Sequence, residues 1–417
     1  MKKLPALFLT IAVCLSVSFA CNRTPDAPDP ASGEIPFPKP AEQIDRVPLT
    51  RAEEAFVQAG NDFAWRLTRK VWAQVQGGKG IILSPLSVQY ALGMLGNGAG
   101  PDVAARLAAV LGYEGTSAIN AFCAKLIECL PAVDTSVTLA LANGVLVKDG
   151  YPLKPAFRSA VETSYGALVH SMPFTDAAAV MKYVNDWCNR HTYGRIPEVL
   201  KEVDAQAFLY LMNAIYFNGK WSEPFEKADT RNEDFRTPSK GTVKVGMMHK
   251  TLEALYAENE GCQSLRIPYG NGRYAFNVYL PKGNGSPAAL LDDPATGLPR
   301  PAEICRVILS IPGFKTDYEI ELKTLLAGMG LPLGPYDELV ENASAPEISK
   351  VIHKATITVD ESGSEAAAVT VVEMRETAVA PGAGPRTVTF TADHPFLYTI
   401  TEATSGVILF TGVYTGE

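Results

Sequence analysis

The chain has 417 residues, of which 47% are hydrophobic and 20% are charged, and its formal net charge is −8. A chain of this length and apolar content can bury most of its apolar surface, as one large domain or two smaller ones. Its mildly acidic balance gives no electrostatic reason to expect nucleic acid or an anionic membrane surface as a partner.

The first 20 residues predict a signal peptide for export. A short positive start, Met1-Lys2-Lys3, precedes a mostly apolar run from Leu4 to Phe19, which is the pattern of a secretory signal. The run is short for a membrane-spanning helix, and nothing later in the chain approaches ~20 consecutive apolar residues.

The residues Ser18-Phe19-Ala20-Cys21 are similar to a bacterial lipobox, although Ser18 stands where that pattern prefers a larger aliphatic residue. We therefore expect Cys21 to be lipidated and to become the N-terminus of a cell-envelope lipoprotein, at the outer membrane or the cell surface. The alternative is an ordinary signal peptide with an incidental cysteine, which would give a secreted protein. Apart from such a lipid, no membrane contact is expected.

Residues 21–49 are predicted to form a spacer between that anchor and the folded domain, which we place at residues 50–417. Proline is frequent in this stretch, and proline-rich segments are extended and poorly packed. The prolines are Pro25, Pro28, Pro30, Pro36, Pro38, Pro40 and Pro48.

Five cysteines remain after Cys14 and Cys21, an odd number with irregular spacing and no CxxC motif. Neither a disulfide framework nor a zinc site is indicated. Buried thiols that act as small apolar residues fit better, and we expect no metal and no cofactor. The five are Cys123, Cys129, Cys188, Cys262 and Cys305.

Periodicity and capping residues predict three helices and a short strand in residues 50–112. Thr50-Arg51-Ala52-Glu53 fits a capping box, and Ser84-Pro85 fits an N-cap followed by the first helical residue. The elements are a helix from Thr50 that ends at Gly77-Gly78, a strand at Ile81–Leu83, a helix from Ser84 that stops at Gly96-Asn97-Gly98, and a helix capped by Asp102 and closed by Gly112.

Strands dominate the rest of the chain, which indicates the α+β class. The stretch Phe208–Phe217 is apolar on both faces, as expected for a buried central strand. The other predicted elements are strands in Ser136–Val147, a helix at Val180–His191, strands at Tyr274–Leu280, Val307–Ile311, Val351–Val359 and Thr387–Phe390, and two strands in Phe396–Tyr414 divided by a turn at Thr404-Ser405-Gly406.

Two polar residues interrupt apolar strand faces. Asn213 lies on the stripe of Leu209, Leu211, Ile215 and Phe217, and His353 lies on the stripe of Val351, Ala355, Ile357 and Val359. A buried polar side chain without a partner costs roughly 1–3 kcal/mol, so each is expected to be hydrogen-bonded. Taken singly, each is interpreted as a satisfied core residue.

The segment between Glu361 and Arg386 follows one clear strand and precedes another, yet no helix or tight hairpin fits it. Its first part holds small side chains, Gly363-Ser364-Glu365-Ala366-Ala367-Ala368, that could slide between existing strands, and Val371-Val372 favours a strand. The segment is therefore a loop by position and a strand by propensity. Such a conflict marks a strained or switching site; the alternative is a variable surface loop.

The chain resembles the serpins, a family of protease inhibitors, from about residue 52 to residue 415. No single matching stretch is specific, but their order and spacing together are. The stretches are Ser84-Pro85-Leu86-Ser87, Asn143-Gly144-Val145-Leu146-Val147, the run from Asn213 to Trp221, Ile267-Pro268-Tyr269, Ile352-His353-Lys354-Ala355, the run from Asp360 to Ala368, His394-Pro395-Phe396 and the run from Gly406 to Gly412.

The resemblance implies an α+β fold with three β-sheets, about nine helices and a metastable native form with an exposed reactive-centre loop at about residues 361–387. It implies that a protease cuts this loop and forms an acyl-enzyme, and that the freed segment then enters the central sheet and halts the protease. About fifteen residues at ~3.4 Å each would carry the protease ~50 Å.

The resemblance also assigns residue roles. The hinge, where insertion begins, comprises Glu361, Gly363, Ser364, Ala366, Ala367, Ala368 and Thr370. The shutter, a polar cluster beneath the opening strands, comprises Ser84, Ser87, Asn213 and His353. Trp221 matches the aromatic residue at the point where insertion starts. These roles revise the interpretation of Asn213 and His353: both are structural, at the place where the sheet must part.

The family spacing places the cut about seventeen residues past the hinge start, counting Glu361 as the first, which gives Thr377-Ala378 as the reactive bond. A small β-branched residue there suits elastase-like or subtilisin-like enzymes. Arg375-Glu376 would attract a trypsin-like or papain-like enzyme, and Met374 is a third alternative.

The expected partner is therefore a serine endopeptidase, or a papain-like cysteine endopeptidase, bound by a monomeric inhibitor that is not an enzyme. No GxSxG, HExxH or phosphate-binding glycine loop is present. The alternative function is a non-inhibitory serpin that acts as a carrier or chaperone. The small-residue hinge argues against that alternative, because non-inhibitory serpins tend to depart from it.

Overall fold

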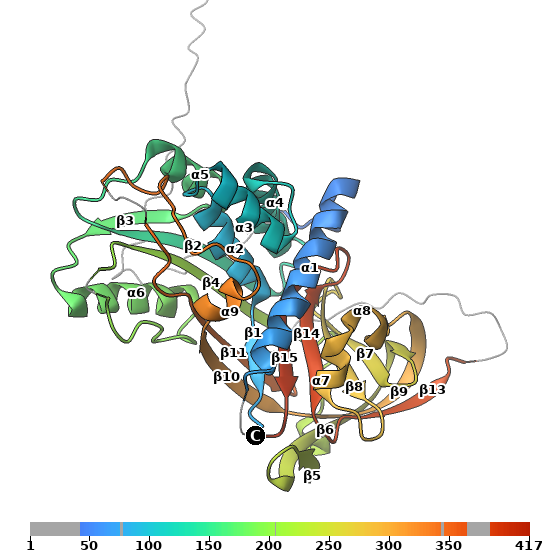
Figure 1. Cartoon of the computed structure of the whole chain (residues 1–417). Helices are drawn as coiled ribbons and strands as arrows, with labels where there is room; N and C mark the ends of the chain where they lie inside the picture. Colours follow the sequence, from blue (N-terminus) through green and yellow to red (C-terminus); the bar gives the residue numbers. More distant parts are fainter. Residues whose placement is uncertain (1–41, 76–77, 205, 343–345, 365–383) are drawn as a thin grey trace, which may run out of the picture. The chain divides into compact units, whose positions relative to one another are not determined.

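Two hydrogen-bonded sheets organise the protein in a computed structural model, which describes residues 42–75, 78–204, 206–342, 346–364 and 384–417 (Figure 1). The six-stranded sheet has the order β10-β11-β12-β4-β2-β3, and the nine-stranded sheet has the order β1-β15-β14-β8-β7-β6-β9-β13, with β5 paired to β6. All of these strands belong to one compact unit, Phe37–Glu417. The predicted signal peptide, Cys21 and most of the spacer lie outside the described residues.

The strands of the six-stranded sheet are β2 (Thr138–Lys148), β3 (Leu168–Met172), β4 (Leu209–Lys220), β10 (Phe314–Glu321), β11 (Ile352–Asp360) and β12 (Gly363–Ser364). The strands of the other sheet are β1 (Ile81–Leu83), β5 (Arg231–Thr237), β6 (Gly241–Glu258), β7 (Cys262–Tyr269), β8 (Tyr274–Pro281), β9 (Glu303–Pro312), β13 (Thr387–Thr391), β14 (Phe396–Glu402) and β15 (Ile408–Tyr414).

One long strand explains why the described residues form two hydrogen-bonded sheets where three were expected. Strand β6 spans 18 residues and pairs with β5 near its start, with β9 along Met247–Tyr256, and with β7 at Leu255–Glu258. Because β6 takes part in all three ladders, the second and third sheets of the expected fold are continuous through it.

Nine α-helices occur in the described residues, and none has the length and apolar character needed to cross a membrane. They are α1 (Arg51–Trp72), α2 (Pro85–Gly96), α3 (Pro101–Leu111), α4 (Thr116–Cys129), α5 (Pro155–Tyr165), α6 (Ala177–His191), α7 (Pro287–Asp292), α8 (Pro294–Gly297) and α9 (Lys323–Ala327). Short 3₁₀ turns lie at Leu130–Ala132 and Lys227–Asp229.

Local capping signals set several helix starts. The capping box of Thr50 and Glu53 is formed at the start of α1, and the Ser84 side chain caps α2, as predicted. The prediction for Asp102 is wrong: Gly100 is the N-cap of α3 and Asp102 lies in its first turn, since Pro101 supplies the preset φ of the first helical position. Gly112 does close α3, in the left-handed conformation.

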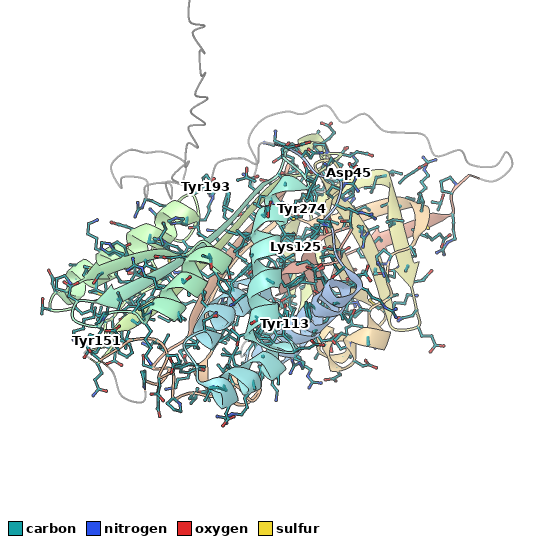
Figure 2. The ribbon with its side chains drawn as sticks, turned by 90° about the horizontal axis from the view of Figure 1, so that it is seen from above. Asp45, Tyr113, Lys125, Tyr151, Tyr193 and Tyr274 are labelled. Atoms are coloured by element: carbon teal, nitrogen blue, oxygen red, sulfur yellow. The ribbon has the colours of Figure 1, made fainter. Side chains whose placement is uncertain are left out.

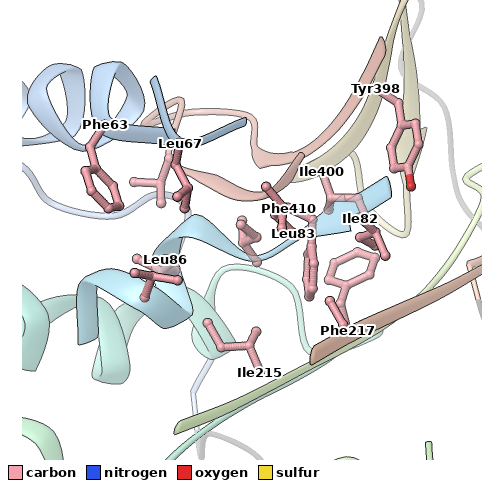
Figure 3. Close-up of a cluster of buried hydrophobic side chains, with 14 of the residues drawn as sticks. Phe63, Leu67, Ile82, Leu83, Leu86, Ile215, Phe217, Tyr398, Ile400 and Phe410 are labelled. Carbon is pink, nitrogen blue, oxygen red and sulfur yellow. The ribbon is translucent and has the colours of Figure 1, made fainter. Parts of the chain in front are cut away.

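The main core lies between the six-stranded sheet and the strands β1, β14 and β15. Figure 3 shows Phe63 and Leu67 of α1, Ile82 of β1, and Ile215 and Phe217 of β4 meeting there. Helix α2 packs against both β4 and β15, so it is enclosed by the two sheets.

A second, smaller apolar cluster lies on the other face of β4. It joins Met212 and Ala214 to Val184 and Trp187 of α6. Even-numbered residues of β4 therefore face α6, and odd-numbered residues, including Asn213, face α2.

Helix α4 is tied to the start of α1 by an ion pair. The Lys125 ammonium group lies 2.6 Å from the Glu53 carboxylate, and Figure 2 labels Lys125 among the side chains of the described residues. Partial burial raises the pKa of Glu53, but the hydrogen bonds from Lys125 and Thr50 outweigh it, so the net shift of that pKa is downward.

Candidate functional site

The start of the predicted loop already lies inside the six-stranded sheet. Gly363 pairs with Asp360 of β11 and with Lys220 of β4, and Ser364 pairs with Val359 and Gly219, antiparallel on both sides. These two residues form β12. In the described residues the ladders of β4 are with β12 and β2, and those of β11 are with β10 and β12. Within the part of the chain that the structure describes, the backbone ladders of β4 and β11 are thus joined through this two-residue bridge alone.

A tight turn delivers the chain from β11 into β12. The Asp360 carboxylate accepts hydrogen bonds from the backbone N–H of Ser362 at 2.8 Å, from its hydroxyl at 2.5 Å, and from the N–H of Gly363 at 3.2 Å. An aspartate that binds the backbone two and three residues later stabilises such a turn. The hinge is therefore a defined structure up to Ser364.

Trp221, just after β4, holds this turn from the side. Its indole N–H donates to the carbonyl oxygen of Asp360 at 2.8 Å, and its backbone N–H donates to that of Ser362 at 3.0 Å. Glu361 is fixed as well, because its carboxylate accepts from the Thr230 hydroxyl at 2.6 Å. The predicted positions of Trp221 and Glu361 at the start of insertion are consistent with these contacts.

The Ser364 side chain points into the core. It is 2% exposed, and its hydroxyl lies 2.6 Å from the hydroxyl of Tyr269. Burial raises the pKa of Tyr269, so the phenol is neutral and can donate this bond. The Tyr269 ring also stacks on Trp221, with ring centroids 4.5 Å apart, so the hydroxyl of Ser364 contacts a tyrosine that Trp221 holds in place.

Only glycine fits at position 363, both because of its backbone conformation and because there is no room for a Cβ atom. Its φ is +152°, and a Cβ atom there would lie 2.2 Å from the carbonyl oxygen of Gly219. Such a distance is far inside van der Waals contact, so any side chain at position 363 would push β12 away from β4.

Beyond the bridge, β4 and β11 border a cavity of about 680 Å³. Its lining includes Leu209–Phe217 of β4, Ser364 of β12, and Val351–Thr358, of which Ile352–Thr358 belong to β11. Among the described residues, no strand pairs with β4 or β11 along this opening beyond β12, and an extended segment fits such a pair of edges.

The predicted shutter residues converge at this opening. The backbone N–H of Ser84 donates to His353 Nε2 at 3.0 Å, while its hydroxyl donates to the Leu409 carbonyl at 2.9 Å. The Ser87 hydroxyl donates to Asn213 Oδ1, and Asn213 Nδ2 donates to Asn143 Oδ1 at 2.7 Å. Serines from α2 thus connect the two strands that border the cavity, and both polar residues are satisfied as expected.

His353 is neutral in this arrangement. Its Nε2 accepts a hydrogen bond, so the ring carries its proton on Nδ1. Burial lowers the pKa of His353 to about 4, because a charged imidazolium would lose its hydration.

Several predicted residues lie outside the described residues. They are Ala366, Ala367, Ala368 and Thr370 of the hinge, and Met374, Arg375, Glu376, Thr377 and Ala378 around the reactive bond. Sequence reasoning missed Tyr269 as the partner of Ser364 and Asn143 as the partner of Asn213. Both lie in stretches that carried the family resemblance, but nothing local assigned them a role.

The far end of the loop is anchored by Arg386. Its guanidinium group pairs with Glu258 at 3.2 Å and Glu303 at 3.1 Å, and it lies over the Tyr256 ring, 5.4 Å from the centroid. The chain then enters β13, which among the described strands pairs with β9. The two ends of the loop are thus held in different sheets.

In the described residues, β4 and β11 thus border a cavity, and the two-residue strand β12 lies between them at one end. The chain matches the family model described as serpin (serine protease inhibitor) over residues 58–416. It is 33% identical over 354 residues to Serpin-Z1C of Triticum aestivum, covering 79% of this chain and 88% of that protein, and 32% identical over 376 residues to Serpin-Z4 of Arabidopsis thaliana, covering 83% and 94%. The chain belongs to the serpin family, whose members are generally protease inhibitors rather than catalysts.

Solved structures agree with this fold. The native state of tengpin, a thermophilic serpin, matches with a TM-score of 0.77 at 25% identity, over 90% of this chain and 97% of that chain. Arabidopsis AtSerpin1 in its native stressed conformation matches with a TM-score of 0.76 at 27% identity, over 88% and 98%. Thyroxine-binding globulin in complex with thyroxine matches at 0.74 and 23% identity, over 86% and 98%, which shows that the fold also serves a protein that binds a small molecule.

Proposed function

We propose that this chain inhibits an endopeptidase by inserting its cleaved loop into the opening between β4 and β11. The observation that carries the proposal is the double pairing of Gly363 and Ser364, because it already starts the missing strand in the right direction and register. Continuing the same register brings ten further residues to the end of β4, with residue 374 opposite Leu209. A cavity of about 680 Å³ lies along those residues of β4, where the strand would enter.

The side-chain pattern of the loop suits that register. Ser364 faces the core. In a strand that continues from it, the even-numbered residues would also face the core, and the odd-numbered residues would face α6. The core-facing series is Ser364, Ala366, Ala368, Thr370, Val372 and Met374, and the charged Glu365 and Glu373 fall in the other series. Between Ser364 and Met374, the stretch that would lie along β4, no charge would have to enter the core, which is the condition for insertion at low cost.

The chemistry belongs to the protease. Its nucleophile, a serine hydroxyl or a cysteine thiol, attacks the carbonyl carbon at the reactive bond, for which we favour Thr377-Ala378, with Arg375 and Met374 as alternatives. An ester or thioester forms on the carbonyl carbon of Thr377, the peptide bond breaks, and the proton lost by the nucleophile is transferred to the leaving amine of Ala378. Cleavage frees the segment from β13, so it can insert. From Ser364 to Thr377 is thirteen residues, a displacement of ~44 Å for the attached enzyme.

The test is incubation of the purified protein with elastase, subtilisin, trypsin and papain, followed by denaturing electrophoresis. The expected result is a covalent band, stable in SDS, with at least one of them. Mass spectrometry of the released C-terminal fragment then identifies the cleaved bond. If every protease cuts the loop and keeps its activity, the inhibitory proposal is wrong and a carrier or chaperone role takes its place.

We also propose that Cys21 is lipidated and that the exported protein is anchored in the cell envelope through residues 21–49. The proposal rests on the lipobox-like sequence alone. Cys21→Ser is expected to move the protein from the membrane fraction to the soluble fraction of the producing cell. If both forms fractionate alike, the chain is secreted or retained by other means.

A further inference from the structure

A second cavity lies away from the opening between β4 and β11. Its volume is about 370 Å³, and its lining consists of Trp72, the last residue of α1, and the segments 236–238, 283–288 and 394–395. Figure 1 shows α7, which begins within the second of these segments, beside α1. We call this space the α1–α7 cavity. Its volume is that of a site for a small molecule rather than for a protein segment.

The apolar walls of the α1–α7 cavity are flat. Trp72 is half-buried and packs against the main core, and Pro287 is buried at the start of α7. Pro238 and Pro395 line the cavity from two other segments. Aromatic rings pack well against an indole ring and against such rigid apolar faces. The walls therefore suit a ligand with a planar aromatic body.

Arg236, the last residue but one of β5, brings a charge to the cavity. Its side chain is 56% exposed. Its Nη2 atom lies 3.4 Å from Asp393 Oδ1 and 3.2 Å from His394 Nδ1, whereas its Nε and Nη1 atoms have no hydrogen-bond partner among the described residues. A guanidinium group with two such donors can hold a carboxylate through paired hydrogen bonds.

The charges around the cavity leave room for one more anion. No aspartate or glutamate is among the described residues that line it. The nearest carboxylate in the chain, Asp393, is shared by two basic groups, because Arg236 and His394 Nδ1 both contact it. The charged residues that flank the lining segments are paired with each other, Lys240 with Glu417 and Lys282 with Glu258.

We propose that the α1–α7 cavity binds a small aromatic carboxylate, with its ring between Trp72 and the prolines and its carboxylate on Arg236. This site is separate from the insertion opening and does not depend on the inhibitory function. The ligand joins α1 and α7 to β5 and to the segment between β13 and β14. Because these contacts exist only in the folded protein, binding raises its stability.

The test is titration of the intact protein with 1-naphthoate, followed by isothermal titration calorimetry. Saturable binding with one site per chain is expected, together with a melting temperature that rises with ligand concentration. The matched ligand is 1-naphthamide, which has the same ring system and no charge. Its affinity is expected to be about tenfold lower, since hydrogen bonds to a charged group are the stronger ones.

Two variants separate the charge from the cavity itself. Arg236→Gln is expected to weaken naphthoate binding about tenfold and to leave naphthamide binding unchanged. Arg231→Gln is its matched control, because Arg231 is an exposed arginine at the other end of β5 and does not line the cavity. Ala288→Phe, at an exposed lining residue in the first turn of α7, fills the cavity without changing a charge and is expected to abolish binding of both compounds.

Four outcomes would overturn the inference: no saturable binding of naphthoate, equal affinity for naphthoate and naphthamide, an equal loss in Arg231→Gln, or full binding by Ala288→Phe. The melting temperature of each variant without ligand shows whether it is folded. None of these measurements involves a protease, so failure of the inhibitory function is distinguishable from failure of the α1–α7 cavity as a binding site.

Discussion

The substitution Ser364→Arg tests the insertion site directly. The Ser364 side chain is buried, it is paired on both sides by β4 and β11, and it forms a hydrogen bond with Tyr269. An arginine at this position must either bury its guanidinium group against the Tyr269 ring or keep β12 out of the sheet. In both cases the first step of insertion is obstructed.

The magnitude follows from the hydrogen bond that the substitution removes and the charge that it adds. Without the Ser364 hydroxyl, a hydrogen bond worth about 1 kcal/mol disappears and the buried Tyr269 hydroxyl is left unpaired, which costs about 1–3 kcal/mol. An unpaired buried charge adds several kcal/mol. If about 3 kcal/mol of this cost is added to the activation free energy of insertion, insertion slows by a factor of about 100 relative to deacylation. The protein should then behave as a substrate.

The assay is the stoichiometry of inhibition, measured with whichever protease the intact protein traps. Ser364→Arg is expected to be cleaved at the reactive bond at a normal rate, without a stable complex. Glu365→Arg is the matched control, because a strand that continues from Ser364 would turn the next side chain to the opposite face. Stable complexes from Ser364→Arg, or equal losses in both variants, would refute the register on which the proposal depends.

Three further outcomes are expected. The intact protein should lose stability as the pH falls from 6.5 toward 4, because His353 binds a proton in the unfolded state and stays neutral in the folded state. The lowering of its pKa from 6.5 to about 4 corresponds to about 3 kcal/mol of unfolding free energy. The unfolding free energy of His353→Gln, measured in urea, should therefore depend less steeply on pH, and equal slopes would contradict the burial argument. Trp221→Phe keeps the stacking on Tyr269 but removes the hydrogen bond from the indole N–H to the carbonyl oxygen of Asp360. It should lower the free energy of unfolding by about 1 kcal/mol, and no change would show that water replaces this hydrogen bond. If insertion continues the β12 register, Thr370 would lie between Asn213 and His353 in the cleaved protein. Thr370→Val is therefore expected to lower the melting temperature of the cleaved protein more than that of the intact one, and a shift in the intact form alone would contradict that register.

Local sequence signals predicted much of the scaffold. The Thr50 capping box and the Ser84-Pro85 start are formed as expected, and the alternating pattern of residues 351–359 corresponds to the alternating burial of β11. These features depend on neighbours in the chain, so propensity and periodicity are enough to find them. Strands β5 and β6 were missed, because β6 alternates irregularly along its length and β5 is largely polar.

The sequence by itself determined the class of the fold. It also showed that residues 361–386 are predicted to be a loop from their position between two strands, whereas their small and β-branched side chains favour a strand. Only the tertiary structure decided how far that strand has already formed, which tyrosine receives Ser364, and how α2 joins Asn213 to His353. The Ser84–His353 contact spans 269 positions and the Tyr269–Ser364 contact spans 95. No local preference encodes such pairings, because they arise only when two sheets and a helix pack around one core.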